Sequence, residues 1–420
     1  MTATAHAMER RGHQQGVGLV ETMVGILIGM IVILVVFNVL SVAEGYKRAT
    51  IGTSDAQITG LLSQFVAGRD AGNGGAGITM SGADLINCTV TEANAPIVGL
   101  PVTDLDNAVR PIPVLITDGG AANVSDSFIS YNAGAAHVMW PVDFTASSAA
   151  GTAITVQSPN GFTVPTPATT PYWAIAMTND ATGRCKVLRV VAATAADASG
   201  RVTLTQGAPV TSVNYSVGPP ARLLNLGPVG LATRVRYDVV GDVLRTTDLM
   251  LAPPAALSPV PVAQNIVLMK VQYGVDNTGD GIVDCWTPAD ASTGCGDFSV
   301  DTVRVAPLAT VNQILAVRIG IVVRSDEPDL RLLTDPSNQT LKDEAKGILS
   351  GTRPQPYLFN CSANDDITCQ SRIKLDMGGT PDGKSNCGKI ICDYWRYRIY
   401  ETVVPIRNAI YSMTSTITPP

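Results

Sequence analysis

A single acidic residue at the edge of a long charge-free segment constrains this chain more than any other feature. Residues 22–43 carry no charge, and Glu21 immediately precedes them. As an α-helix with a rise of ~1.5 Å per residue, this segment is about 33 Å long, enough to cross a hydrocarbon core of ~30 Å. A carboxylate carried to mid-membrane costs roughly 2.5–3.5 kcal/mol, which predicts a function and a cationic partner for Glu21.

The residues before Glu21 include a short basic leader, with Arg10 and Arg11, that ends at Gly16. This arrangement resembles the class III leader of type IV pilins and pseudopilins. In that family a prepilin peptidase cleaves after a glycine, and the acid is fifth in the mature chain. Cleavage after Gly16 makes Val17 the first residue and Glu21 the fifth. The resemblance implies a leader peptide of residues 1–16 and a methylated amine at Val17.

Two other interpretations of the N-terminus remain open. Residues 41–43 are small enough for a signal-peptidase site, so secretion with cleavage before Glu44 is one alternative. A plain membrane anchor is the other. Basic residues flank the apolar segment on both sides, so the positive-inside rule does not set its orientation.

Composition limits the partners and the compartment. The net charge of −6 and the lack of a long basic run argue against nucleic acid as the principal partner. The eight cysteines all follow the apolar segment, which indicates disulfides in an oxidising compartment outside the inner membrane. Zinc is disfavoured, because there is no Cys-x-x-Cys and His137 is the single histidine after the leader. The cysteines are Cys88, Cys185, Cys285, Cys295, Cys361, Cys369, Cys387 and Cys392.

The helix is expected to continue beyond the membrane. Apolar residues recur at helical spacing at Ile58, Leu61, Leu62, Phe65 and Val66, which predicts an apolar face packed on a globular domain. The glycine-rich residues 68–82 then end the helix. We expect a helix over residues 17–68 whose transmembrane half is 22–43.

The rest of the chain, residues 69–420, has the texture of a β-domain. Short runs of Val, Ile and Thr alternate with Pro, Gly, Asn and Asp. In residues 315–324 the odd positions are apolar and the even ones include both arginines, which predicts one buried and one solvated face. The expected fold class is α+β and pilin-like: a long N-terminal helix packed on a large antiparallel β-rich domain.

Several β segments carry a second resemblance. Residues 266–284, 316–325 and 397–408 resemble the PilW family of minor pilins, whereas residues 90–170 match nothing in that family and are predicted as an insertion. The resemblance implies a tip complex with other minor pilins that primes the major pilin, serves twitching motility and adhesion, and carries a large tip adhesin. It implies that Glu21 pairs with the free amine of a neighbouring subunit.

The implied precursor lies in the bacterial inner membrane with its N-terminus in the cytoplasm, and the assembled subunit is extracellular. Two rival classes stay open. One is a minor pseudopilin of type II secretion. The other is a ligand-binding adhesin that the helix merely anchors, with residues 90–170 as its binding module.

Proximity in the chain and likeness to the family suggest four disulfides. Cys88–Cys185 would fasten the end of the helix to the sheet. The remaining pairs would be Cys285–Cys295, Cys361–Cys369 and Cys387–Cys392, with nested pairing open for the last four cysteines.

No motif supports catalysis. Residues 378–385 satisfy the P-loop pattern, but a β-like stretch follows where a phosphate-binding helix is required. His137 has no neighbouring nucleophile, and the carboxylates are scattered through polar turns. The chain is not expected to be an enzyme.

One loop has the residue types of a calcium site. The ligands would be Asp276, Thr278, Asp280, the carbonyl of Ile282 and Asp284, with Gly281 at the turn position. Thr287 stands where a bidentate glutamate is usual, so binding would be weak. An ordinary polar turn uses the same residue types and remains the alternative.

Overall fold

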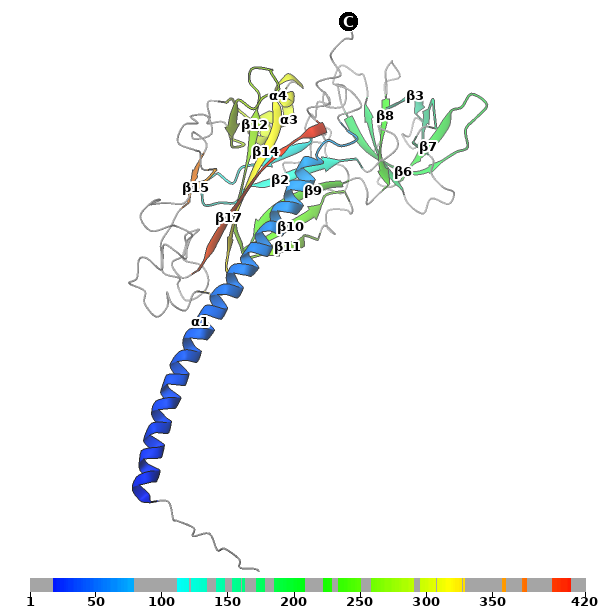
Figure 1. Ribbon diagram of the computed structural model, residues 1–420. Helices are drawn as coiled ribbons and strands as arrows, with labels where there is room; N and C mark the ends of the chain where they lie inside the picture. Colours follow the sequence, from blue (N-terminus) through cyan, green and yellow to red (C-terminus); the bar gives the residue numbers. More distant parts are fainter. Residues whose placement is uncertain are drawn as a thin grey trace, which may run out of the picture.

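The computed structural model describes most of the N-terminal helix and the β-strands. The described residues are 18–78, 112–120, 122–133, 141–147, 153–159, 161–162, 171–177, 185–207, 222–228, 233–250, 258–290, 295–306, 308–326, 328, 357–359, 372–375 and 395–408. They confirm the α+β fold class, with one long N-terminal helix and a large antiparallel β-rich region (Figure 1).

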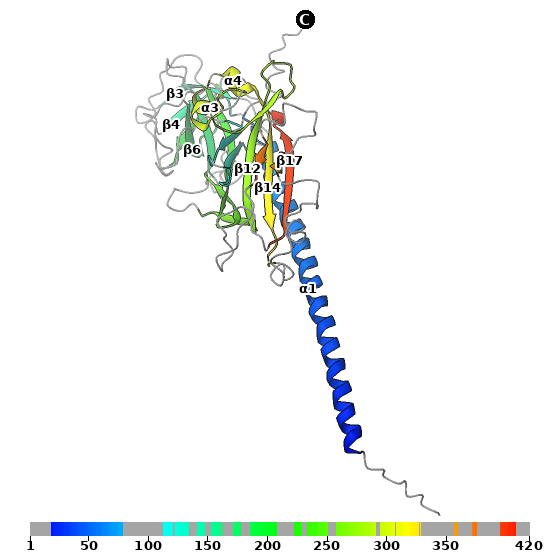
Figure 2. The same ribbon diagram turned by 90° about the vertical axis from the view of Figure 1, so that its left-hand side faces the viewer.

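Helix α1 spans Leu19–Gly72, so it ends beyond the expected residue 68. The chain turns sharply after it, where Gly75 has a φ of 79° and its N–H donates to the carbonyl of Tyr131. A side chain at that φ would be strained, which is why glycine suits this exit. The first half of α1 projects away from the strands, and the second half lies along them (Figures 1 and 2).

Two antiparallel sheets enclose the main core with the second half of α1. The five-stranded sheet has the order β1 (Val114–Thr117), β2 (Ser127–Asn132), β9 (Thr233–Val240), β10 (Val243–Asp248) and β11 (Val260–Gln264). The four-stranded sheet has the order β13 (Cys285–Thr287), β12 (Ile266–Val275), β14 (Ile314–Arg324) and β17 (Tyr397–Pro405). Two short helices, α3 (Val300–Val305) and α4 (Leu308–Asn312), connect β13 to β14.

A closed six-stranded barrel is formed by the part of the chain between two neighbouring strands of the five-stranded sheet, β2 and β9. Its strands are β3 (Val142–Ser147), β4 (Ala153–Val156), β7 (Val202–Gln206), β6 (Cys185–Ala193), β5 (Tyr172–Met177) and β8 (Arg222–Pro228). β2 and β9 flank the barrel in the chain, yet they pair directly, with Phe128 opposite Tyr237. The expected insertion at residues 90–170 stays a prediction. This range contains β1 and β2 of the five-stranded sheet and β3 and β4 of the barrel.

The prediction of a solvated face on residues 315–324 is wrong, because β14 is buried on both faces. Val317 and Ile319 face the main core. On the other face Val322 packs with Leu358 and Trp395, beside β15 (Tyr357–Leu358) and β16 (Ile373–Lys374). Arg318 lies between the rings of Trp286 and Phe359, with its guanidinium carbon 4.9 and 4.4 Å from the two centroids. The covering layer comes from distant sequence, so alternation within β14 could not reveal it.

The domain-facing side of α1 also differs from the expectation. Small residues form the buried side, namely Ala56, Gly60, Ser63, Ala67 and Ala71. Ile58, Leu61, Leu62 and Phe65 are exposed instead, and Val66 alone of the predicted set packs against the core. A Cβ added at Gly60 would overlap the ring of Tyr400 on β17, so the helix lies too close to the sheet for larger side chains.

We expect Ala67→Leu to lower the free energy of unfolding by about 1–3 kcal/mol, because Ala67 is fully buried and the extra carbons would push α1 away from the sheet. The matched control is Leu61→Ala, which changes a side chain that is 58% exposed and should shift stability by less than about 0.5 kcal/mol. Denaturant unfolding of the full chain in detergent, followed by tryptophan fluorescence, measures both. A larger loss for Leu61→Ala would contradict this assignment of the two faces.

Candidate functional site

The first half of α1 is apolar, and its large side chains are exposed. Among the described residues, α1 is the one helix long and apolar enough to cross a membrane, and none of its most apolar window is buried in the protein. Glu21 lies in the first helical turn, where the unpaired backbone N–H groups favour a negative charge. Gly16 and Val17 lie outside the described residues, so cleavage between them stays a prediction.

The second half of α1 adds a narrower apolar surface. Ile51, Ile58, Leu61, Leu62 and Phe65 lie on the side away from the β-domain, and we call these residues the outer stripe. Phe65 is 65% exposed. Exposed apolar side chains are therefore present both in residues 22–43 and, after a stretch that contains Glu44, Lys47 and Arg48, at the level of the strands. At that level the opposite side of the helix is already occupied by the β-domain.

Polar contacts fix the end of α1 on the five-stranded sheet. The hydroxyl of Tyr237 donates to Oδ2 of Asp70 at 2.5 Å, and the hydroxyl of Ser130 donates to the Asp70 carbonyl at 2.5 Å. Tyr237 also stacks on Phe128, with ring centroids 4.7 Å apart. Burial, together with the Asp70 carboxylate, raises the pKa of Tyr237, so the phenol stays a donor. Sequence reasoning missed Asp70, because a single acid near the end of a helix has no distinguishing pattern.

In the expected calcium loop, the carboxylates of Asp276 and Asp284 accept hydrogen bonds from backbone N–H groups of the loop itself. Oδ1 and Oδ2 of Asp276 accept from the N–H groups of Gly279 at 2.6 Å and Gly281 at 2.8 Å. Oδ2 of Asp284 accepts from the N–H groups of Asn277 and Thr278. Burial alone would raise the pKa of Asp276, but the N–H groups of Gly281 and Gly279 hold it below its usual value.

Within the part of the chain that the structure describes, which includes this loop, no group of three or more His, Cys, Asp or Glu side chains is arranged to hold a metal ion. The five ligands named from the sequence thus lie near one another in a turn, but their oxygen atoms do not point toward a common position for a metal ion. Calcium binding would have to draw carboxylate oxygens away from amide donors. It stays a prediction.

One predicted cysteine pair is present, since Cys285 and Cys295 are joined by a disulfide next to this loop. Cys185 begins β6, but its side chain is not described. The other five cysteines lie outside the described residues, and their pairings stay predictions: Cys88, Cys361, Cys369, Cys387 and Cys392. Residues 378–385, with the P-loop pattern, lie outside them as well.

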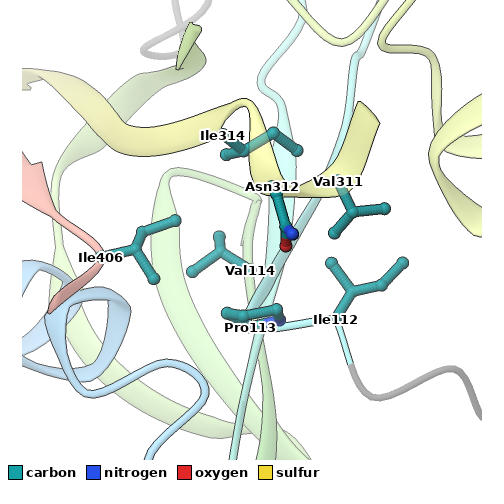
Figure 3. Close-up of a pocket in the computed structure, with 7 residues that line it drawn as sticks. All are labelled: Ile112, Pro113, Val114, Val311, Asn312, Ile314 and Ile406. Carbon is teal, nitrogen blue, oxygen red and sulfur yellow. The ribbon is translucent and has the colours of Figure 1, made fainter. Parts of the chain in front are cut away.

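A small pocket opens where β1, α4 and β14 begin or end (Figure 3). Its seven lining residues are Ile112, Pro113, Val114, Val311, Asn312, Ile314 and Ile406. Asn312 is the one polar member of this lining, and none of the seven can serve as an acid, base or nucleophile.

The comparison with protein families matches one part of this framework. The model of the family PilW, described as type IV pilus-assembly protein W, covers residues 235–408. Over these residues the chain is similar to the PilW family. The PilW region begins within β9 and contains all the strands that follow, whereas α1 and the barrel precede it. No curated protein and no solved structure matches the chain. This similarity indicates a role in type IV pilus assembly.

We expect Tyr237→Phe to lower the free energy of unfolding by about 1.5–3 kcal/mol, because the partly buried Asp70 carboxylate loses its phenol donor. The comparison variant is Arg69→Gln, which removes the other Asp70 partner from a side chain that is 55% exposed. That exposed pair should contribute at most about 1 kcal/mol. Equal effects in denaturant unfolding of the two variants would argue against Tyr237 as the fastening group.

For the loop at 276–284 we expect millimolar calcium to raise the melting temperature of the full chain slightly, with a Kd on the order of 10⁻⁴–10⁻³ M. Asp280→Ala should abolish this rise, since its carboxylate is a proposed ligand and holds only the Ile282 N–H. Asp197→Ala, in a turn of the barrel with similar amide contacts, should leave the calcium effect unchanged. Calorimetry with calcium and with chelator measures it, and identical melting of the wild type in both would make this an ordinary polar turn.

Proposed function

We propose that this protein is a minor pilin that joins other pilins through α1 and is anchored in the inner membrane before assembly. The observation that carries the proposal is the exposed apolar surface of α1, both in the segment that can cross a membrane and in the outer stripe. Exposed apolar surface of this extent is costly in water and marks a lipid or protein interface. The PilW match makes pilus components the natural partners.

In this proposal a prepilin peptidase removes residues 1–16, and the new amine at Val17 is methylated. The subunit then leaves the bilayer laterally, and Glu21 pairs with the free amine of a neighbouring subunit. The pairing converts an isolated acid in an apolar environment into a complementary contact that sets the register between helices. The protein does not act as an enzyme in this role.

We further propose a position at the pilus tip, with minor pilins as neighbours, the major pilin below and a large tip adhesin above. The barrel supports this position, because it extends the subunit at the end away from the membrane half of α1 (Figure 1). At the tip of a pilus a domain of this size has to be accommodated only once. In the shaft it would have to be accommodated at every subunit. The tip complex would serve twitching motility and adhesion.

We expect Glu21→Ala to leave membrane insertion intact and to reduce incorporation into sheared pili by tenfold or more. Insertion persists because the change removes a charge from an apolar segment, and incorporation falls because the neighbouring amine loses its partner. Membrane fractionation and immunoblots of the pilus fraction measure the two steps. Phe65→Ser on the outer stripe should reproduce the assembly defect with normal stability.

The controls separate processing from assembly. Gly16→Leu should give an uncleaved precursor in the inner membrane, whereas Glu21→Ala gives a distinct assembly defect. Asp55→Asn changes an exposed polar residue of α1 outside the stripe and should assemble normally. Normal pili and motility in both Glu21→Ala and Phe65→Ser would contradict the proposal. Loss of protein export with unaffected motility would instead indicate a type II secretion pseudopilin.

A further inference from the structure

A lysine and two aspartates meet in a buried site where the turn between β1 and β2 contacts β12 of the four-stranded sheet. Lys270 of β12 places Nζ 2.7 Å from Oδ1 of Asp126 and 3.3 Å from Oδ1 of Asp118. Both aspartates belong to the turn between β1 and β2, 144 positions from Lys270 in the case of Asp126. The side chains of Lys270, Asp126 and Asp118 are 4%, 2% and 12% exposed. Neither assembly nor the PilW match accounts for this cluster.

The carboxyl group of Asp126 is held rigidly, with a backbone donor on each oxygen. Oδ2 accepts from the N–H of Val271 at 2.8 Å, and Oδ1 accepts from the N–H of Gly119 at 3.0 Å. Asp118 shares a further hydrogen bond with Asp126. Fixed N–H donors polarise a carbonyl carbon and stabilise an oxyanion that forms on it. Asp126 is therefore prepared as an electrophile, with an amine beside it.

The two carboxyl groups are driven toward different protonation states. Burial raises the pKa of Asp126 to about 7, so its neutral acid form is well populated at neutral pH. Burial would raise the pKa of Asp118 too, but the hydrogen bond with Asp126 and the charge of Lys270 hold it below its usual value. One acid and one base thus lie within reach of the same amine.

We propose that Lys270 and Asp126 condense into an intramolecular amide bond, with Asp118 as the general base. Asp118 accepts a proton from the Lys270 ammonium. The free Nζ then attacks Cγ of the neutral Asp126 carboxyl, and the N–H of Val271 stabilises the oxyanion. A new C–N bond forms, and the C–O bond to the Asp126 hydroxyl breaks, releasing one water.

The protons balance without any other reactant. Three ammonium protons and one carboxyl proton enter the step. One stays on the amide nitrogen, two leave in the water, and one remains on Asp118. No oxidant or reductant is needed. The reaction replaces a buried ammonium and a buried carboxylate with neutral groups, which removes their desolvation penalty.

The fold supplies the conditions that this condensation requires. Holding the amine against the carboxyl gives an effective concentration on the order of 10⁵–10⁸ M, and burial keeps out the water that would reverse the step. The amide would join the two sheets. It would also close residues 126–270 into a covalent loop of the chain, and this loop contains all the strands of the barrel. Resting on the proposed function, we infer that the bond protects a tip subunit against pulling force.

The test is the intact mass of the purified full chain after reduction of its disulfides. We expect the mass to fall short of the sequence mass by one water, beyond any N-terminal processing, and tandem mass spectrometry to find a branched peptide that joins Lys270 to Asp126. Lys270→Arg and Asp118→Ala should both recover the full mass, because one removes the amine and the other the base. Asp242→Asn, which breaks the Arg324 ion pair outside this cluster, should keep the loss of water.

A wild-type chain of full mass, with native circular dichroism, would overturn the amide bond without reference to any variant. A branched peptide through another residue pair would overturn it as well. Neither result would bear on pilus assembly, since incorporation into pili is measured separately with Glu21→Ala. Conversely, loss of one water in a chain that never enters pili would support the bond and contradict the assembly role.

Discussion

The close contact between α1 and the strands β14 and β17 is the constraint on which the rest of the structure depends. Ala and Gly on the inner side of the helix bring its backbone close to the sheet, and dispersion contacts over this short distance close the main core. The same contact leaves the larger apolar side chains outside. A core made with small residues therefore gives α1 a second, unoccupied apolar surface.

Polar groups then determine how the helix is rotated on the sheets. A contact between small residues is smooth and could slide, whereas hydrogen bonds are directional. Asp70 meets Tyr237 on β9 and Ser130 on β2, and the Gln64 amide donates to the Glu401 carbonyl on β17 at 2.7 Å. Because these bonds reach both sheets, they hold one orientation of α1, and with it the direction in which the outer stripe faces.

The barrel is an addition that the framework tolerates because the pairing of β2 with β9 is complete without it. It has its own core, with Phe144 and Leu204 among its members. A second apolar cluster, which includes Ile175 of the barrel and Tyr131 of β2, packs the barrel against the five-stranded sheet. A load on the barrel would thus reach α1 through β2 and β9, the segment that the Lys270–Asp126 link would enclose.

The sequence by itself determined the features that depend on local composition: the charge-free segment after Glu21, the long helix, the antiparallel β-rich class and the Cys285–Cys295 pair. Only the tertiary structure decided which side of α1 is buried, because Leu61 and Ala67 belong to two sets that both repeat at helical spacing. The burial of Arg318 and Lys270 could not be predicted from the sequence, for the same reason. Their burial comes from segments far away in the chain, and hydrophobic periodicity reports only what a segment can bury, whereas long-range packing selects what it does bury.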